Sequence, residues 1–142
     1  MPTEREGRLV AVGRIAIVVS RYHERLTSRL LEGAQAACTD AGTAPDAVDI
    51  LWVSGAFELG VTATAAARSG DYAAVVALGI VVRGETPHFD FVAGETSAAL
   101  RAAASETLVP VVCGAVMPVD GCFVQPVHVH TGFFFQCLVS GC

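Results

Sequence analysis

Four short apolar runs, separated by stretches of helical character, limit most strongly how this chain can fold. The runs are rich in valine and isoleucine and scarcely alternate between apolar and polar side chains. Strands that are covered on both faces have this pattern, because neither face meets water. We therefore predict four buried strands, at residues 14–20, 48–54, 73–82 and 109–117.

The stretches between these runs have the patterns of three helices, at residues 24–42, 57–70 and 89–107. In the first, five residues at helical spacing form one apolar stripe: Leu26, Leu30, Ala34, Ala37 and Ala41. Gly42 suits the left-handed conformation in which helices often end. The second stretch is alanine-rich and ends at Gly70. Each of the first three strands is thus followed by a helix that can return the chain to the sheet.

Unbroken alternation of strand and helix predicts an α/β fold, with a four-stranded parallel sheet and helices on both faces. The chain of 142 residues is long enough for one domain with a single core, and we expect residues 1–142 to form one domain. In such folds the carboxyl ends of the strands lie at one edge, where ligands bind. Three polar loops follow the first three strands, at residues 20–24, 54–58 and 83–88, and we expect them to converge on one site.

The charge and the amino-terminal sequence exclude several classes of partner. The formal net charge is -5, so the sequence offers no electrostatic basis for binding nucleic acid or an anionic membrane. Residues 1–14 are charged and lack the apolar core of a signal peptide, and no stretch is typical of a spanning helix. We therefore expect a soluble, cytoplasmic protein.

Two features of composition bear on the chemistry. Every basic residue is arginine, so an enzyme-bound Schiff base to lysine is excluded. The five cysteines include no C-x-x-C pair, and their odd number argues against a closed disulfide framework. We expect most of them to be reduced thiols.

The loop at residues 83–88 holds the strongest candidates for chemistry. Imidazole titrates near neutral pH, so His88 can both donate and accept a proton, or it can simply bond a backbone carbonyl. Gly84, Glu85 and Thr86 precede a helix start, where free N–H groups suit a phosphate; an ordinary turn is the alternative. Arg83 can pair with that phosphate or with a neighbouring carboxylate.

Three other sets of residues have two interpretations each. Glu58, at the start of the second helix, either interacts with the helix dipole or accepts hydrogen bonds from ligand hydroxyls. Tyr22 either stacks on a flat heterocycle or packs its own loop. His128 and His130 share one face of any extended segment, but no third metal ligand is evident, so we expect no metal site.

Three segments together resemble the 6,7-dimethyl-8-ribityllumazine synthase family of riboflavin biosynthesis. They are "SRYHERLTSRLLEGA", "VSGAFELG" and "VVALGIVVRGETPHFDFVAGE", and their order and spacing agree with the family from about residue 14 to residue 116. The pair "GAFE" and "RG-x-T-x-HFD" is specific to it. The resemblance implies a three-layer flavodoxin-like fold that assembles into pentamers or shells of sixty subunits, with riboflavin synthase as a possible partner protein.

The implied reaction condenses 5-amino-6-(D-ribitylamino)uracil with 3,4-dihydroxy-2-butanone 4-phosphate, without a metal or an organic cofactor. By the same resemblance, Tyr22 stands where the family has an aromatic residue that stacks on the pyrimidine. Ala56, Phe57 and Glu58 line the ribityl pocket, with Glu58 holding hydroxyls.

The remaining roles are likewise implied by the resemblance. Backbone groups of three consecutive residues meet the pyrimidine edge: Ile80, Val81 and Val82. Glu85 and Thr86 meet the phosphate of the four-carbon substrate, and His88 is the proton donor. Cys113 occupies a position that reaches the pocket of a neighbouring subunit.

Residues 117–142 depart from the family pattern. From residue 107 to the end the only charged side chain is Asp120, and no amphipathic stripe is visible. The family ends in helices, which we expect to be missing or altered here, and one of them carries a phosphate-binding arginine. Val127 lies near the place of that arginine. The alternative to an active enzyme is therefore an impaired or inactive homologue that forms shells or binds ligands.

Overall fold

Four parallel strands form one sheet in the computed structural model, which describes residues 1–4 and 13–114. The strands are β1 (Ile15–Ser20), β2 (Val48–Val53), β3 (Ala74–Leu78) and β4 (Val111–Cys113). Their order in the sheet is β2-β1-β3-β4, and every neighbouring pair is parallel. The chain places β2 on one side of β1 and then β3 and β4 on the other side, as in flavodoxin-like folds. This topology confirms the predicted α/β class.

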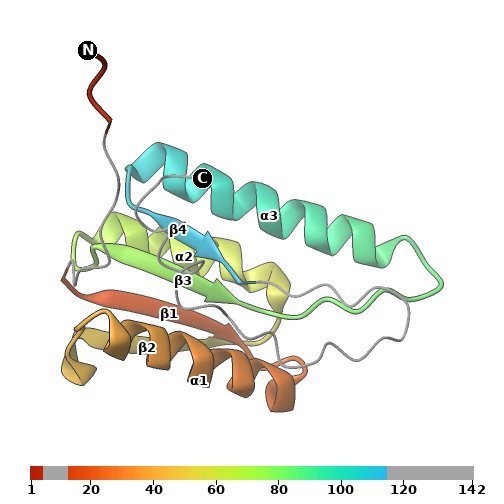
Figure 1. Cartoon of the computed structure of the whole chain (residues 1–142). Coiled ribbons are helices and arrows are strands. Elements are labelled where there is room, and N and C mark those ends of the chain that lie inside the picture. The colour runs from red at the N-terminus through yellow and green to blue at the C-terminus, as the bar shows by residue number, and fades with distance from the viewer. Residues whose placement is uncertain (5–12, 115–142) are drawn as a thin grey trace.

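Three α-helices cover the two faces of this sheet (Figure 1). They are α1 (Glu24–Asp40), α2 (Leu59–Ser69) and α3 (His88–Thr107). Two short 3-10 turns precede β2 and α2, at Pro45–Ala47 and Ala56–Glu58. The apolar core divides accordingly, with α1 on one face and α2 and α3 on the other.

The central strand β1 shows why the apolar runs do not alternate. Ala16 and Val18 pack with the core under α2 and α3, whereas Ile17 and Val19 pack with the core under α1. All four side chains have no exposed surface. A strand that is covered on both faces needs an apolar residue at every position.

The prediction of a third strand over residues 73–82 is wrong at its carboxyl end. Strand β3 stops at Leu78, because its pairing with β1 ends there and its pairing with β4 ends at Ala77. Ile80 and Val81 are buried all the same, although Ile80 forms only an isolated bridge and Val81 packs in the core under α2 and α3. Burial made this segment apolar, so its composition did not reveal where the strand ended.

The predicted apolar stripe of α1 is also wrong in part. The buried residues of the helix are Thr27, Leu31, Ala34, Ala37 and Cys38, whereas Leu26 is exposed and Leu30 is only partly buried. Thr27 can enter the core because its Oγ1 donates a hydrogen bond of 2.7 Å to the carbonyl oxygen of Ser20. The predicted helix ends are confirmed, since Gly42 and Gly70 adopt φ angles of 86° and 80°.

No helix within residues 1–4 and 13–114 is long and apolar enough to cross a membrane. Several predictions fall outside these residues. They concern the end of the fourth strand beyond Gly114, the atypical segment 117–142 and the pair His128 and His130.

Candidate functional site

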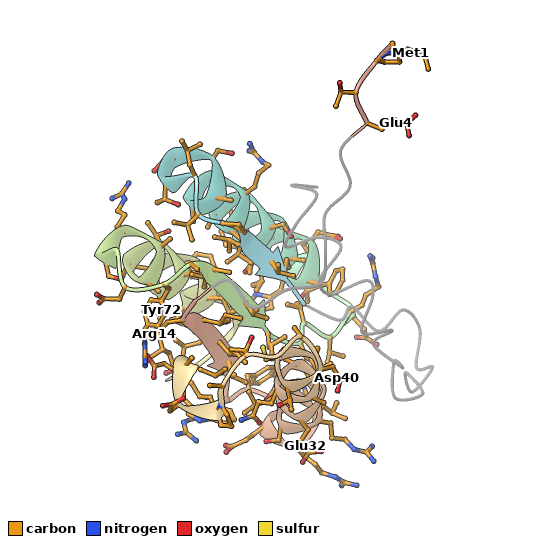
Figure 2. All side chains as sticks on the ribbon, turned by 60° about the vertical axis from the view of Figure 1, so that its left-hand side comes forward. Met1, Glu4, Arg14, Glu32, Asp40 and Tyr72 are labelled. Carbon is orange, nitrogen blue, oxygen red and sulfur yellow. The ribbon has the colours of Figure 1, made fainter. Side chains whose placement is uncertain are left out.

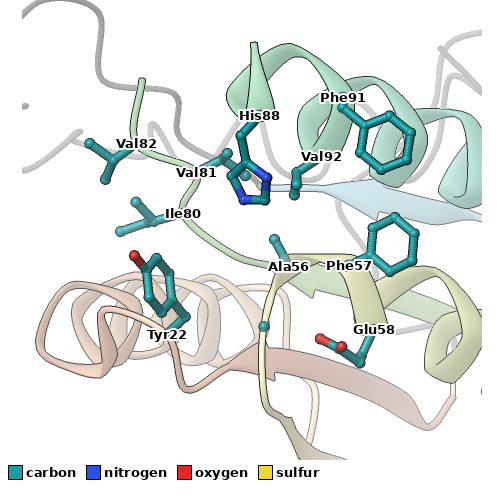
Figure 3. Close-up of a pocket in the computed structure, with 11 residues that line it drawn as sticks. Tyr22, Ala56, Phe57, Glu58, Ile80, Val81, Val82, His88, Phe91 and Val92 are labelled. Atoms are coloured by element: carbon teal, nitrogen blue, oxygen red, sulfur yellow. The ribbon is translucent and has the colours of Figure 1, made fainter. Parts of the chain in front are cut away.

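A cavity of about 460 Å³ opens at the carboxyl edge of the sheet, where the loops after β1, β2 and β3 converge (Figure 3). Eleven residues line it: Tyr22, Gly55, Ala56, Phe57, Glu58, Ile80, Val81, Val82, His88, Phe91 and Val92. Eight of the eleven residues predicted for the site are among them. The other three, Glu85, Thr86 and Cys113, are exposed and do not line the cavity.

Tyr22 forms one wall of the cavity, from the loop after β1. The backbone N–H groups of Arg21 and Tyr22 donate hydrogen bonds of 2.8 and 3.1 Å to the carbonyls of Val53 and Ser54, which fixes this loop to the end of β2. Tyr22 is 59% exposed and contacts the His23 ring in an edge-to-face arrangement, with ring centroids 4.3 Å apart at 67°. An aromatic face thus remains available to a flat ligand.

Glu58 comes from the Ala56–Glu58 turn after β2. It precedes α2, yet its side chain makes no hydrogen bond that caps the helix. A Cβ atom at Gly55 would lie 3.1 Å from Oε2 of Glu58, so the absence of a side chain at Gly55 leaves room for this carboxylate. The geometry favours Glu58 as a hydrogen-bond acceptor in the cavity over a helix cap.

His88 is the first residue of α3, and its imidazole points into the cavity from the side opposite Tyr22 and Glu58 (Figure 3). The chain reaches it along Ile80, Val81 and Val82, which leave the sheet and cross its edge. A titratable ring, a carboxylate and an aromatic face therefore surround one space. Such a set can orient a polar heterocyclic ligand and move a proton.

Arg83 contacts two residues in the first turn of α3, Phe89 and Asp90. Its guanidinium lies 4.5 Å from the centroid of the Phe89 ring, and its Nη2 is 3.6 Å from Oδ1 of Asp90. Of the partners considered from the sequence, the structure pairs it with Asp90. These contacts tie the loop that carries Glu85 and Thr86 to the first turn of α3.

Sequence reasoning missed three lining residues, namely Gly55, Phe91 and Val92. Phe91 stacks on Phe57, with ring centroids 6.1 Å apart at 19°, and the two rings form the wall of the cavity away from Tyr22. Helical spacing contained this signal, because Phe91 and Val92 follow His88 by three and four residues and so share its face.

The profile of the family described as "6,7-dimethyl-8-ribityllumazine synthase" matches residues 13–121 of this chain. The chain belongs to that family. It is also 50% identical over 101 residues to the 6,7-dimethyl-8-ribityllumazine synthase of Gemmatimonas aurantiaca. This match covers 71% of the chain and 62% of that relative.

The family match includes the three loops that form the cavity. It also includes all four strands of the sheet, so one family match covers both the fold and the cavity. The chain spans less than two thirds of the relative's length.

Proposed function

We propose that the chain is a 6,7-dimethyl-8-ribityllumazine synthase of riboflavin biosynthesis. It would condense 5-amino-6-(D-ribitylamino)uracil with 3,4-dihydroxy-2-butanone 4-phosphate and release phosphate and water. The single observation that carries the proposal is the convergence of Tyr22, Glu58 and His88 on one cavity in a member of this family.

Binding of the pyrimidine substrate follows from the walls of the cavity. The ring of Tyr22 stacks on the heterocycle, and the backbone of residues 80–82 meets its polar edge. The Glu58 carboxylate accepts hydrogen bonds from ribityl hydroxyls, and hydrogen bonds to a charged acceptor are stronger than neutral ones. The four-carbon phosphate lies toward Glu85 and Thr86, at the mouth, where their backbone N–H groups can bind the anion.

The reaction needs positioning and proton transfer more than a strong nucleophile. The amine of one substrate attacks the ketone of the other, so the absence of lysine is no obstacle. Imine formation releases one water, the imine then loses phosphate by elimination, and ring closure releases a second water. His88 exchanges the protons of these steps, and one cavity that holds both substrates supplies proximity.

Incubation of the purified chain with both substrates tests the proposal. We expect the lumazine and one equivalent of phosphate to form. Chromatography measures the lumazine, and a phosphate assay measures the phosphate. Binding of a ribitylamino-pyrimidine analogue without any turnover would instead indicate the impaired homologue.

We also propose that the chain acts as a homo-oligomer, with a pentamer or a shell of sixty subunits as the assembled form. Family membership and an exposed apolar face support this proposal. That face consists of Phe57, Val61 and Phe91, which are 54%, 69% and 60% exposed. Riboflavin synthase as a partner and the cytoplasm as the location, both expected from the sequence, remain part of the proposal.

A further inference from the structure

The Ala56–Glu58 turn is held by a side chain from outside its own segment. Oγ1 of Thr96, in the middle of α3, donates a hydrogen bond of 3.2 Å to the carbonyl oxygen of Ala56. Thr96 is only 3% exposed, and Ala56 is buried as well. The same carbonyl accepts the backbone N–H of Leu59, so this buried oxygen has two donors.

Thr96 connects the two halves of the cavity wall. His88, Val92 and Thr96 are spaced four residues apart, so they lie along one stripe of α3. His88 and Val92 line the cavity, and Thr96 continues the stripe beneath the turn that carries Phe57 and Glu58. Within residues 1–4 and 13–114, this is the one hydrogen bond between α3 and that turn.

The remaining contacts between these segments are apolar, and Ala56 shares a buried cluster with Phe89 and Ala93 of α3. Phe57 stacks on Phe91, but both rings are more than half exposed. A stacked pair of rings tolerates a range of offsets, whereas a buried hydrogen bond fixes a distance and a direction. Among the described residues, the hydroxyl of Thr96 therefore adds the directional contact between the segments that carry Glu58 and His88.

We propose that Thr96 is a positioning residue, whose hydroxyl holds the Glu58 carboxylate and the Phe57 ring in register with His88. The proposal rests on the proposed function, since it concerns the ribityl side of the same cavity. Loss of the hydroxyl shifts the turn, so it weakens binding of the ribityl substrate and leaves the phosphate side untouched.

Three substitutions separate the hydroxyl from the shape of the side chain. Thr96→Val keeps the shape and removes the donor, Thr96→Ser keeps the donor, and Thr96→Ala is a second variant without a donor if Val does not fold. The matched control is Thr64→Val, because Oγ1 of Thr64 donates only to Gly60 in its own helix.

We expect Thr96→Val to raise the KM for the ribitylamino-pyrimidine by roughly three- to tenfold, as loss of one neutral hydrogen bond implies. The kcat and the KM for the butanone phosphate should stay within about twofold, and Thr96→Ser should restore the first KM. In hydrogen exchange, the amides of residues 55–59 should exchange faster in Thr96→Val than in the wild type or in Thr64→Val.

The proposal is overturned if Thr96→Val keeps both the wild-type KM and the wild-type exchange of residues 55–59. It is also overturned if Thr96→Ser raises the KM for the ribitylamino-pyrimidine as much as Thr96→Val does, because Thr96 would then act through packing and not through its hydroxyl. If the wild type shows no turnover, the proposed function fails by itself. The exchange of residues 55–59 then still decides whether Thr96 holds the turn.

Discussion

Glu58 and His88 each begin a helix at the edge of the cavity, and each has a purely structural alternative. A helix cap at Glu58 would need a capping hydrogen bond, and its side chain makes none, so the helix dipole is the structural alternative that remains. The backbone-bonded alternative for His88 requires a carbonyl partner, and its imidazole has none among the described residues. Both side chains instead line the cavity, which is why their substitutions should affect function more than stability.

Glu58→Gln should weaken binding of the ribityl substrate. The amide keeps the shape of the side chain but removes the charge, and hydrogen bonds to a charged acceptor contribute about 1.5–3 kcal/mol. We expect the KM for the pyrimidine to rise about tenfold or more, with a smaller change in kcat. An unchanged KM in steady-state kinetics would leave Glu58 without a binding role.

His88→Ala should slow the reaction without emptying the cavity. General acid–base catalysis by a positioned side chain contributes about 10²–10⁴-fold, and we expect the low end because positioning supplies much of the rate. The measurement is kcat, with calorimetric binding of a ribitylamino-pyrimidine analogue as the control. A variant with the wild-type kcat would remove His88 from the mechanism.

Three residues of the cavity wall could be predicted from local signals in the loops, whereas the other five predicted lining residues came only from the resemblance to the family. A polar group after an apolar run marked Tyr22, Glu58 and His88. Thr96 had no such signal, since its partner Ala56 is 40 residues away and only the fold brings them together. Long-range hydrogen bonds of this kind leave no periodic pattern in a single sequence.

The close approach of α2 and α3 depends on Gly60. A Cβ atom at this position would lie 2.5 Å from Cβ of Ala99, which is well inside van der Waals contact. Gly60→Ala should therefore destabilise the chain, because overpacking of a tight interface costs about 1–3 kcal/mol. Urea unfolding measures the change.

Gly94→Ala is the matched control for this prediction. Gly94 lies in the interior of α3, and nothing is within 4 Å of a Cβ atom built there. Alanine at this position should stabilise the helix by about 0.5–1 kcal/mol, because it reduces the entropy that glycine loses on folding. If both substitutions have the same sign, contact with Ala99 is not the cause.

The amino-terminal edge of the sheet is tied together by an exposed cluster around Asp49. Arg14 donates two hydrogen bonds of 2.8 Å to its carboxylate, and the hydroxyl of Tyr72 donates a third of 2.9 Å. Arg14 also donates to the carbonyl of Asp46, so β1, β2 and the start of β3 meet here (Figure 2). The hydrogen bonds from Arg14 and then Tyr72 lower the pKa of Asp49.

Because the pKa of Asp49 is lower in the folded than in the unfolded state, the ionised carboxylate stabilises the fold. This stabilisation is fully present above the ordinary carboxyl pKa, near pH 4, and is lost as the pH falls through the pKa of the folded state. Asp49→Asn should therefore lower the melting temperature slightly at pH 7 and flatten its decline below about pH 4. The effect is small because the cluster is exposed and screened by salt. The control is Asp40→Asn, an exposed carboxylate without an ion pair in the part of the chain that the structure describes. If the melting temperatures of Asp49→Asn and the wild type fall equally steeply below pH 4, the prediction is wrong.

The fold was predictable where burial and secondary structure agree, and only there. The four strands and their order along the chain followed from apolar runs, although only β1 and β3 are buried at every position and the edge strand β2 is partly buried throughout. The end of β3 did not follow, since Ile80 and Val81 are buried outside the ladder. The buried face of α1 did not follow either, because a polar residue, Thr27, occupies the core with its hydroxyl bonded to Ser20.

On the scale of the assembled protein, the apolar face of Phe57, Val61 and Phe91 is the interface that we propose. Phe57 and Val61 are four residues apart across the start of α2, and Phe91 stacks on Phe57, so the three side chains are contiguous. Exposed, contiguous apolar groups next to a ligand cavity are typical of an interface. A second copy of the chain on this face would also shield the cavity from water.

Val61→Asp should prevent this association. Val61 is 69% exposed and does not line the cavity, so a carboxylate there leaves the folded subunit and its pocket intact. In the interface it would bury an unpaired charge, which costs several kcal/mol, enough to dissociate the assembly at micromolar concentration. Sedimentation velocity should show an oligomer for the wild type and a monomer for Val61→Asp. Gln35→Asp, on the exposed side of α1 across the sheet, should sediment like the wild type. An oligomer of wild-type size for Val61→Asp would place the interface elsewhere on the molecule.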